Sequence, residues 1–429
     1  MVRIYASLIA AFMATCAWAQ SMPATVAEGM TPPIGTSASA ISATPLTLSR
    51  AIEHALRANP ALSAAAREVE ALEGGLIQAG AIPNPELEAL VEDTRSSTRT
   101  TTLQINQPIE LGGKRAARIA AAERARDIGT VDLDARRAEV RAAVASAFFE
   151  ALSAQERLRI ARASSELAQR SLDVAARRVL AGKVSPVEET RARVAASAAR
   201  VEFAQATSES AVARQRLAST WGATRVDFDR IHGAPEALAP AVPLDVLLAR
   251  LNDAAAVQRL QLEVQRRDAL VEVERSRRYP DITLSVGAKR DEEIGRDQVV
   301  LGVAVPLPLF DRNRGNVLEA LRRADKARDE QAAARAQLVA ELINARTRYA
   351  ALREEVEISR VEILPGAQSA FDAATKGFEL GKFDFLDVLD AQRTLFQAQS
   401  QYFRALAEAH RSAADIDRVL GEHVASTQP

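Results

Sequence analysis

Several kinds of side chain that often carry chemistry are scarce in this 429-residue sequence. It has one cysteine, Cys16, and four scattered histidines with no H-x3-H pair. A protein metal site of the zinc type needs several thiol or imidazole ligands close together. No nucleophile and base stand in a recognisable catalytic motif either. These absences predict no metal site, no cofactor and no enzymatic activity.

Net charge and aromatic side chains are equally low. The chain carries 55 Lys and Arg against 56 Asp and Glu, so no general attraction to nucleic acid is expected. Aromatic residues make up 4% of the chain although hydrophobic residues make up 48%, and the difference is largely alanine. This composition is typical of thin helices that pack closely, and not of a broad globular core.

Long apolar runs are missing beyond the N-terminus. Arg3, the short apolar stretch 4–14 and the sequence Ala17-Trp18-Ala19 predict a signal peptide over residues 1–19 that is removed on export. The alternative is a lipid anchor on Cys16, although Thr15 is bulkier than the residue that such processing prefers. No later stretch stays apolar for about 18 residues, so a membrane crossing would have to use strands.

The sequence is duplicated. Residues 46–221 are repeated at 244–420 with a nearly constant offset: Pro83 corresponds to Pro280, and Gly182 to Gly381. We expect a first repeat over 46–222 and a second over 244–421. A linker over 223–243, rich in proline, joins them. A flexible N-terminal extension (20–45) and a C-terminal tail (422–429) lie outside the repeats.

Each repeat is expected to hold a helix, a β-hairpin (84–107 or 281–306) and a long helical hairpin (113–221 or 313–420). A seven-residue apolar spacing in the long helices predicts coiled-coil packing, and 65 such residues would span about 100 Å. The offset between the two seams is predicted to be 198 throughout. The seams comprise Val140, Val144, Ala147, Ala151, Ala154, Leu158, Ala161, Ser165, Ala168, Leu172, Ala175 and Val179 in the first repeat, and Leu338, Leu342, Ala345, Tyr349, Leu352, Val356, Ser359, Ile363, Gly366, Ala370, Ala373 and Gly377 in the second.

The predicted strands alternate between apolar and small or polar residues. Leu284, Val286 and Ala288, for example, alternate with Ser285 and Gly287. Such strands suit the wall of a membrane β-barrel, and the alternative is two surface hairpins packed on helices. Four strands are too few to close a barrel, because the smallest membrane barrels have about eight. A membrane location therefore predicts that several copies share one barrel.

The layout of the repeats, and the segment 378–391 with its glycine turn and Asp387-Val388-Leu389-Asp390-Ala391, resemble the TolC-type outer-membrane efflux proteins. The resemblance covers residues 46–421. It implies a mainly α fold with a small β part, a homotrimer, a twelve-stranded barrel in the lipid of the outer membrane, and a periplasmic tube of α-helices. The first-repeat counterpart of the tip, residues 179–193, keeps the glycine turn but replaces the aspartates.

Two segments where strand becomes helix, 107–115 and 306–316, are similar to the CzcC-like branch of that family, which is associated with cobalt, zinc and cadmium export. The resemblance implies an inner-membrane RND pump and a periplasmic adaptor as partners. Drug export or protein secretion by the same fold is the alternative, as is a soluble periplasmic coiled-coil scaffold or adaptor. Gly112-Gly113-Lys114 lacks the spacing of a phosphate-binding loop.

The candidate site residues lie at the turns of the helical hairpins. Asp387 and Asp390 are three residues apart, so they share a helix face, and the resemblance implies that they line a periplasmic gate with Lys382 and Arg393 as charge partners. The alternative is a solvated helix face. By the same resemblance the adaptor docks at the tips, for which plain turn residues are the alternative. The tip residues are Gly182, Lys183, Ser185, Gly381, Lys382 and Phe383.

Overall fold

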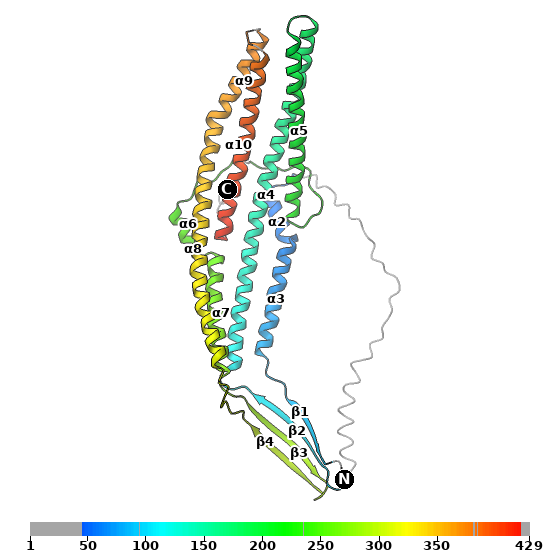
Figure 1. Cartoon of the computed structure of the whole chain (residues 1–429), viewed down its shortest axis with the longest axis vertical. Helices are drawn as coiled ribbons and strands as arrows, with labels where there is room; N and C mark the ends of the chain where they lie inside the picture. The colour runs from blue at the N-terminus through cyan, green and yellow to red at the C-terminus, as the bar shows by residue number, and fades with distance from the viewer. Residues whose placement is uncertain (1–44, 94, 235, 381, 384, 422–429) are drawn as a thin grey trace, which may run out of the picture. The chain divides into compact units, whose positions relative to one another are not determined.

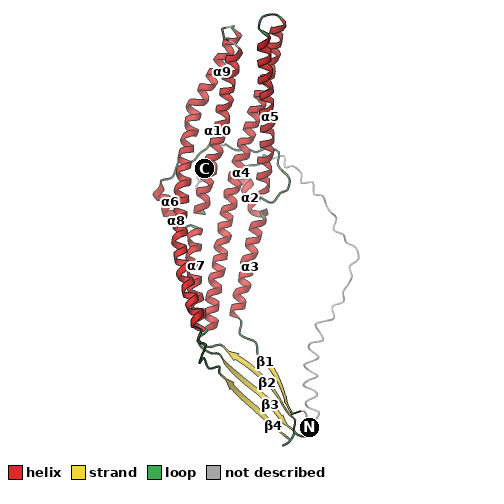
Figure 2. Ribbon diagram, in the orientation of Figure 1, coloured by secondary structure: helices red, strands yellow, loops and turns green. Residues whose placement is uncertain are grey.

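A computed structural model describes residues 45–421 of the chain, apart from residues 94, 235, 381 and 384. The expected signal peptide, all but the last residue of the N-terminal extension, the C-terminal tail and Gly381 lie outside the described residues. The described chain is mainly helical with one small β-sheet, which confirms the predicted fold class (Figures 1 and 2). None of the helices in this part combines the length and the apolarity that crossing a membrane requires.

The two halves contain matching elements in the same order. Within each half the strands connect to one end of the long helices, and the helical turns lie at the other end (Figure 1). The first half contains α2 (Leu48–Ala58), α3 (Pro60–Gly80), β1 (Glu86–Glu92), β2 (Thr100–Ile109), α4 (Lys114–Leu180) and α5 (Pro186–Ser219). The second contains α6 (Leu244–Leu251), α7 (Ala255–Ser276), β3 (Ile282–Asp291), β4 (Arg296–Ala304), α8 (Arg314–Ile358), a π-helical turn (Ser359–Ile363), α9 (Leu364–Glu379) and α10 (Phe385–Leu420).

The single helix expected before each β-hairpin is in fact two helices. In the first half the break falls at Asn59, whose side-chain oxygen accepts from the N–H groups of Ala61 (2.8 Å) and Leu62 (3.2 Å). Its side-chain nitrogen donates to the carbonyl of Thr220 at 2.7 Å. Pro60 supplies the first residue of α3, where its missing N–H costs nothing. The break therefore ties the start of the first half to the end of α5.

The four strands form one antiparallel sheet in the order β1-β2-β3-β4. The central pairing of β2 with β3 joins the two halves, with Leu103 opposite Ala288 and Ile105 opposite Val286. Strands β2 and β3 approach so closely at Gly287 that a Cβ there would lie 2.6 Å from the Leu103 carbonyl. Within the described residues, β1 and β4 are each paired along one edge only.

The register of the sheet separates apolar from polar side chains. Because partners across the ladder point to the same side, most aliphatic residues of the four strands share one face, while Leu90 and Val300 lie on the other. That face is exposed, and Val299 and Leu301 of β4 are each 77% exposed. On the opposite face, Glu88 accepts hydrogen bonds from Gln104 (2.7 Å) and Asn106 (2.8 Å). The aliphatic face comprises Leu87, Ala89, Val91, Leu103, Ile105, Ile109, Ile282, Leu284, Val286, Ala288, Val299, Leu301 and Val303.

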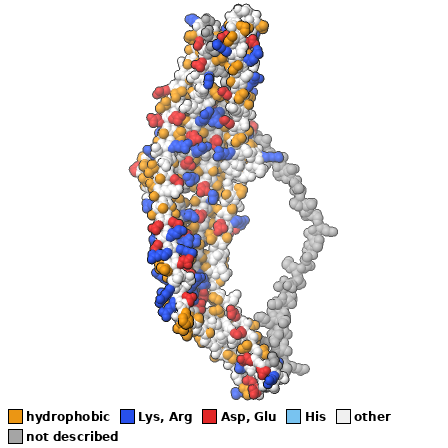
Figure 3. Space-filling view, in the orientation of Figure 1, with side chains coloured by type: hydrophobic (Ala, Val, Ile, Leu, Met, Phe, Trp, Pro, Cys, Tyr) orange, Lys and Arg blue, Asp and Glu red, His pale blue; other side chains and the backbone are white. Residues whose placement is uncertain are grey.

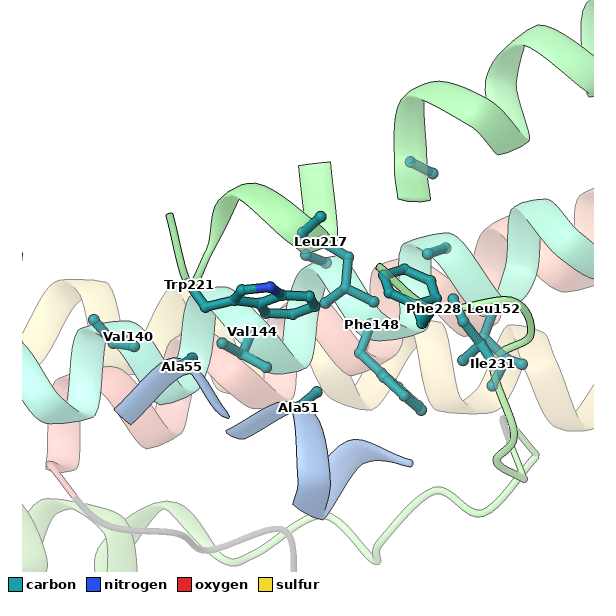
Figure 4. Packing of buried hydrophobic residues seen from close by; sticks show 14 of the residues in the cluster. Ala51, Ala55, Val140, Val144, Phe148, Leu152, Leu217, Trp221, Phe228 and Ile231 are labelled. Atoms are coloured by element: carbon teal, nitrogen blue, oxygen red, sulfur yellow. The ribbon is translucent and has the colours of Figure 1, made fainter. Parts of the chain in front are cut away.

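Helix α4 is the common support of the helices, since α3, α5, α7 and α10 all pack along it. The predicted seam of the first half lies inward along its whole length, and none of its residues is exposed. The largest cluster gathers around Phe148 of α4, with α2 and the segment after α5 closing over it (Figure 4). Small residues such as Ala51 and Ala55 let α2 approach α4 closely.

The predicted seam of the second half is wrong from Ile363 to Ala373, although its last residue, Gly377, is buried. Ile363, Gly366, Ala370 and Ala373 are exposed, whereas Ala367 and Ala374 are buried. The cause is the π-helical turn Ser359–Ile363, which adds one residue to the helix and rotates everything after it. Pro365, the second residue of α9, has no N–H for a regular helical bond. The offset between the halves therefore changes here from 198 to 199.

Candidate functional site: the hairpin turns and the groove beside them

The turn between α4 and α5 closes with a glycine in the left-handed region. Gly182 has φ +67°, and its N–H donates to the carbonyl of Val179 at 2.9 Å. The next N–H, of Lys183, reaches back to Arg178 at 2.9 Å, which completes a Schellman-type cap. Ser185 caps the start of α5 by accepting from the N–H of Val187 at 3.3 Å. The first turn is thus held by its own backbone.

The turn between α9 and α10 uses the same backbone bond. The N–H of Lys382 donates to the carbonyl of Gly377 at 2.8 Å, in the position that Lys183 and Arg178 occupy in the first half. The ring of Phe383 lies directly on Gly377, where a Cβ would lie 2.1 Å from a ring carbon. Lys382 and Phe383 are both exposed. Any substitution at Gly377 would therefore displace the aromatic ring from the turn.

The two hairpins contact each other below their turns. The guanidinium of Arg178 on α4 lies over the ring of Phe378 on α9, 4.3 Å from its centroid. The side-chain amide of Gln392 on α10 donates to the hydroxyl of Ser164 at 3.2 Å. A small apolar cluster lies between these two contacts. Its members are Ala175, Ala192, Leu172, Phe378 and Leu389.

An open groove of about 1180 Å³ runs beside this contact, with α4 as its floor and α5 and α10 as its walls. Asp390 and Arg393 line the groove, while Asp387 and Lys382 do not. Asp387 is exposed on the same helix, nearer to the turn. Within the described part of the chain, Asp390 forms no ion pair with Lys382 or Arg393. The structure therefore brings Asp390 and Arg393 to one surface, and places Lys382 apart at the turn.

Sequence reasoning missed most of the charged residues of the groove. Arg157 of α4 pairs with Glu209 of α5 at 3.1 Å, and Glu202, Arg191 and Arg404 also line the groove. The seven-residue spacing of Glu202 and Glu209 was a visible signal, because it places both on one face of α5. Arg178 and Gln392 had no such signal, since each contacts a residue far away in the sequence.

No three His, Cys, Asp or Glu side chains converge into a metal-holding group anywhere in the described ranges. The charges at the groove and at the turns are mostly exposed, so water and salt screen them. Such groups attract or repel a passing ion and contribute to weak protein contacts.

The chain matches the family model described as "Outer membrane efflux protein" twice, over residues 51–223 and 248–422. The chain belongs to the outer membrane efflux protein family. It is therefore an outer-membrane efflux channel of a Gram-negative bacterium and not an enzyme, as the sequence predicted. Both matched ranges contain one pair of strands and one helical hairpin, in agreement with the structure.

Individual family members agree with this assignment. The chain is 50% identical over 380 residues to the cobalt-zinc-cadmium resistance protein CzcC of Cupriavidus metallidurans, covering 89% of this chain and 91% of that protein. It is 30% identical over 283 residues to the nickel-cobalt-cadmium resistance protein NccC of Alcaligenes xylosoxydans xylosoxydans, with 64% of each covered. The outer membrane protein VceC of Vibrio cholerae has the same fold at 20% identity, with a TM-score of 0.72 over 87% of this chain and 96% of that one.

The left-handed cap at Gly182 generates a test of the turn. In Gly182→Ala the new Cβ would meet its own carbonyl, at a cost of about 1–2 kcal/mol. We expect hydrogen exchange of the backbone N–H groups of Gly182 and Lys183 to accelerate by roughly fivefold or more. Gly366→Ala is the matched control, because Gly366 lies in α9 with open space around it and no positive φ. Equal exchange in the parent and Gly182→Ala would contradict a strained cap.

Proposed function

We propose that this channel is the exit duct for divalent heavy-metal cations such as cobalt, zinc or cadmium. The observation that carries the proposal is the 50% identity to CzcC, which extends over 91% of that protein. The cargo is proposed by this similarity, whereas the channel function follows from family membership.

The proposed assembly is a homotrimer. In lipid, a sheet with unpaired edges would leave backbone N–H and C=O groups without partners, so the edge of β1 must meet the β4 edge of another copy. Three copies of the four-stranded sheet supply twelve strands, enough to close a barrel. The exposed aliphatic face of the sheet would then contact lipid. The polar face, with Glu88, would line the interior.

The proposed partners lie at the opposite end of the helices. The hairpin turns with Gly182, Lys183, Ser185, Lys382 and Phe383 are the sites that we assign to a periplasmic adaptor. The adaptor would connect the channel to an inner-membrane RND pump. The exposure of Lys382 and Phe383 supports this assignment, because both side chains are available for contact.

In this proposal, selectivity for cations comes from weak electrostatic attraction and not from tight binding of the ion. A conduit must release each ion as readily as it admits it. Asp387 and Asp390, repeated in three copies, would form two rings of carboxylates near the periplasmic entrance, where Lys382 and Arg393 supply nearby positive charge. Such rings attract a hydrated divalent cation and repel anions without coordinating either.

Deletion of the gene tests the cargo. We expect a deletion strain to grow at a lower concentration of at least one of zinc, cobalt, cadmium and nickel than its parent, since the exported ion would accumulate in the cell. Growth on graded metal plates measures the difference, and restoring the gene should reverse it. A panel of drugs is the comparison. Unchanged tolerance to every metal, together with a new sensitivity to a drug, would exclude the metal assignment.

Charge reversal tests the gate. In a pore reconstituted in a planar bilayer, Asp387→Lys with Asp390→Lys should lower the preference for cations, because rings of positive charge replace rings of negative charge. The reversal potential in a salt gradient measures the preference. The matched control is Asp329→Lys with Glu354→Lys, two exposed acidic residues of α8 without an ion pair among the described residues. An unaltered reversal potential in the first variant would remove both aspartates from the gate.

A further inference from the structure

The loop between β4 and α8, residues 305–313, exposes large apolar side chains to solvent. Phe310 is 100% exposed, and Leu307 and Leu309 are exposed beside it in the sequence. Tyr279, in the middle of the connection from α7 to β3, is also exposed, and its ring lies directly on the backbone of Gly112. We name these residues of the loop together with Tyr279 the junction loop. Water disfavours such exposed large apolar side chains.

The junction loop is held in a defined conformation. Asn313 sits in the left-handed region with φ 55°, and its N–H donates to the Asp311 carboxylate at 2.9 Å. Its side-chain nitrogen donates to the backbone carbonyl and the carboxylate of Glu274 on α7, at 2.8 and 2.9 Å. The Arg312 Nε donates to the Pro308 carbonyl at 3.3 Å. The exposure of Phe310 therefore belongs to an ordered loop.

Three arginines adjoin these apolar residues in the sequence, although Asp311 also lies among them. Arg278, Arg312 and Arg314 are exposed, and in the part of the chain that the structure describes none of them pairs with a carboxylate. The other arginines near the ends of α7 and α8 are partly neutralised, as in the pair of Arg277 with Glu274 at 2.6 Å. Figure 3 shows hydrophobic side chains gathered where α7 and α8 meet the strands, next to a surface rich in Lys and Arg.

The duplicated position in the first half provides an internal comparison. There the segment after β2 satisfies its charges within the chain: Lys114 pairs with Asp281 at 2.7 Å, and Arg118 pairs with Glu110. Its apolar residues Ile109 and Leu111 are much less exposed than Phe310. The first half exposes Ile82 at this level, and its Arg115 donates to the Gly80 carbonyl. The second half exposes the larger ring of Phe310 and, among the described residues, has three exposed arginines there without a carboxylate partner. The turn geometry alone does not require this combination.

We propose that the junction loop, with Arg278, Arg312 and Arg314, docks onto the surface of a bilayer and selects anionic phospholipids there. Aromatic and aliphatic side chains insert at the level of the headgroups, while arginines extend to the phosphates. The position fits, because the loop begins where β4 ends, on the side of the helices. The inference rests on the proposed function only in that the strands must cross a membrane.

Charge distinguishes lipid from a neighbouring subunit as the occupant. A protein contact that covered Phe310 would also have to neutralise three arginines. A leaflet that contains phosphatidylglycerol supplies negative charge to all three arginines, and no complementary protein surface is needed. Each arginine near such a surface contributes an attraction that changes binding by roughly fivefold.

Fluorescence quenching by brominated lipid tests the proposal. The full-length protein with Phe310→Trp is reconstituted in vesicles of phosphatidylcholine with a minority of phosphatidylglycerol. Bromine is placed on one lipid or on the other while the composition stays constant. The emission of the parent, whose Trp221 is buried, is subtracted. We expect quenching per brominated lipid to be several-fold stronger with phosphatidylglycerol, as roughly fivefold per arginine implies.

Two further variants make the result decisive. Arg278→Gln, Arg312→Gln and Arg314→Gln together should make the two lipids quench equally. The matched control changes three exposed arginines of α4 and α5 that also lack carboxylate partners among the described residues: Arg170→Gln, Arg177→Gln and Arg200→Gln. This control should leave the preference for phosphatidylglycerol unchanged. Equal quenching by the two lipids in Phe310→Trp with all its arginines present would overturn the proposed selection of anionic lipid.

The failure of this inference is distinguishable from the failure of the proposed function. Leu301→Trp reports on the exposed aliphatic face of β4. Strong quenching of that variant without quenching of Phe310→Trp would place the sheet in the membrane and the junction loop under a neighbouring subunit, which overturns the inference alone. Absence of quenching in both would show that the sheet itself does not contact lipid.

Discussion

The sheet has one exposed aliphatic face, and among the described residues its two edge strands, β1 and β4, are each paired on one side only. The rest of the structure depends on this constraint. In water such a face is costly, and in lipid the open edges are costly, since each unpaired backbone group loses its hydrogen bonds. In the proposed trimer, pairing β1 of one copy with β4 of the next would relieve the cost of the edges, and lipid would relieve the cost of the face. Within each chain, small residues such as Ala168 of α4 and Ala196 of α5 let the two helices of a hairpin pack closely.

The duplication gives the two halves one scaffold and lets them differ where the surroundings differ. The first half keeps a continuous α4 of 67 residues, while the second interrupts its long helix with the π-helical turn. The aspartates of the turn and the exposed junction loop also belong to the second half alone. The first half mainly supports the body through α4, and the second carries the surfaces that we assign to ions and lipid.

Much of the fold could be predicted from the sequence because periodicity reports burial directly. The alternation of Leu284, Val286 and Ala288 indicated the face of β3, and the heptads of α4 indicated its buried side. The rotation of the helix after Ser359 could not be predicted from local spacing. Small residues occur both at the positions of a continued heptad and at the positions shifted by one, so the sequence fits either. The change of offset from 198 to 199 contained that information. The contact of Arg178 with Phe378 depends on how two hairpins pack, which no local pattern encodes.

The number of subunits tests the central claim most directly, because every assignment in lipid requires strands from more than one copy. The mass of the purified full-length protein in detergent, measured by native mass spectrometry, should correspond to three copies. Gentle heating should then separate them into single chains as the β1 and β4 edges part. A protein that remains a single chain, and that stays soluble after the detergent is removed, would contradict the account.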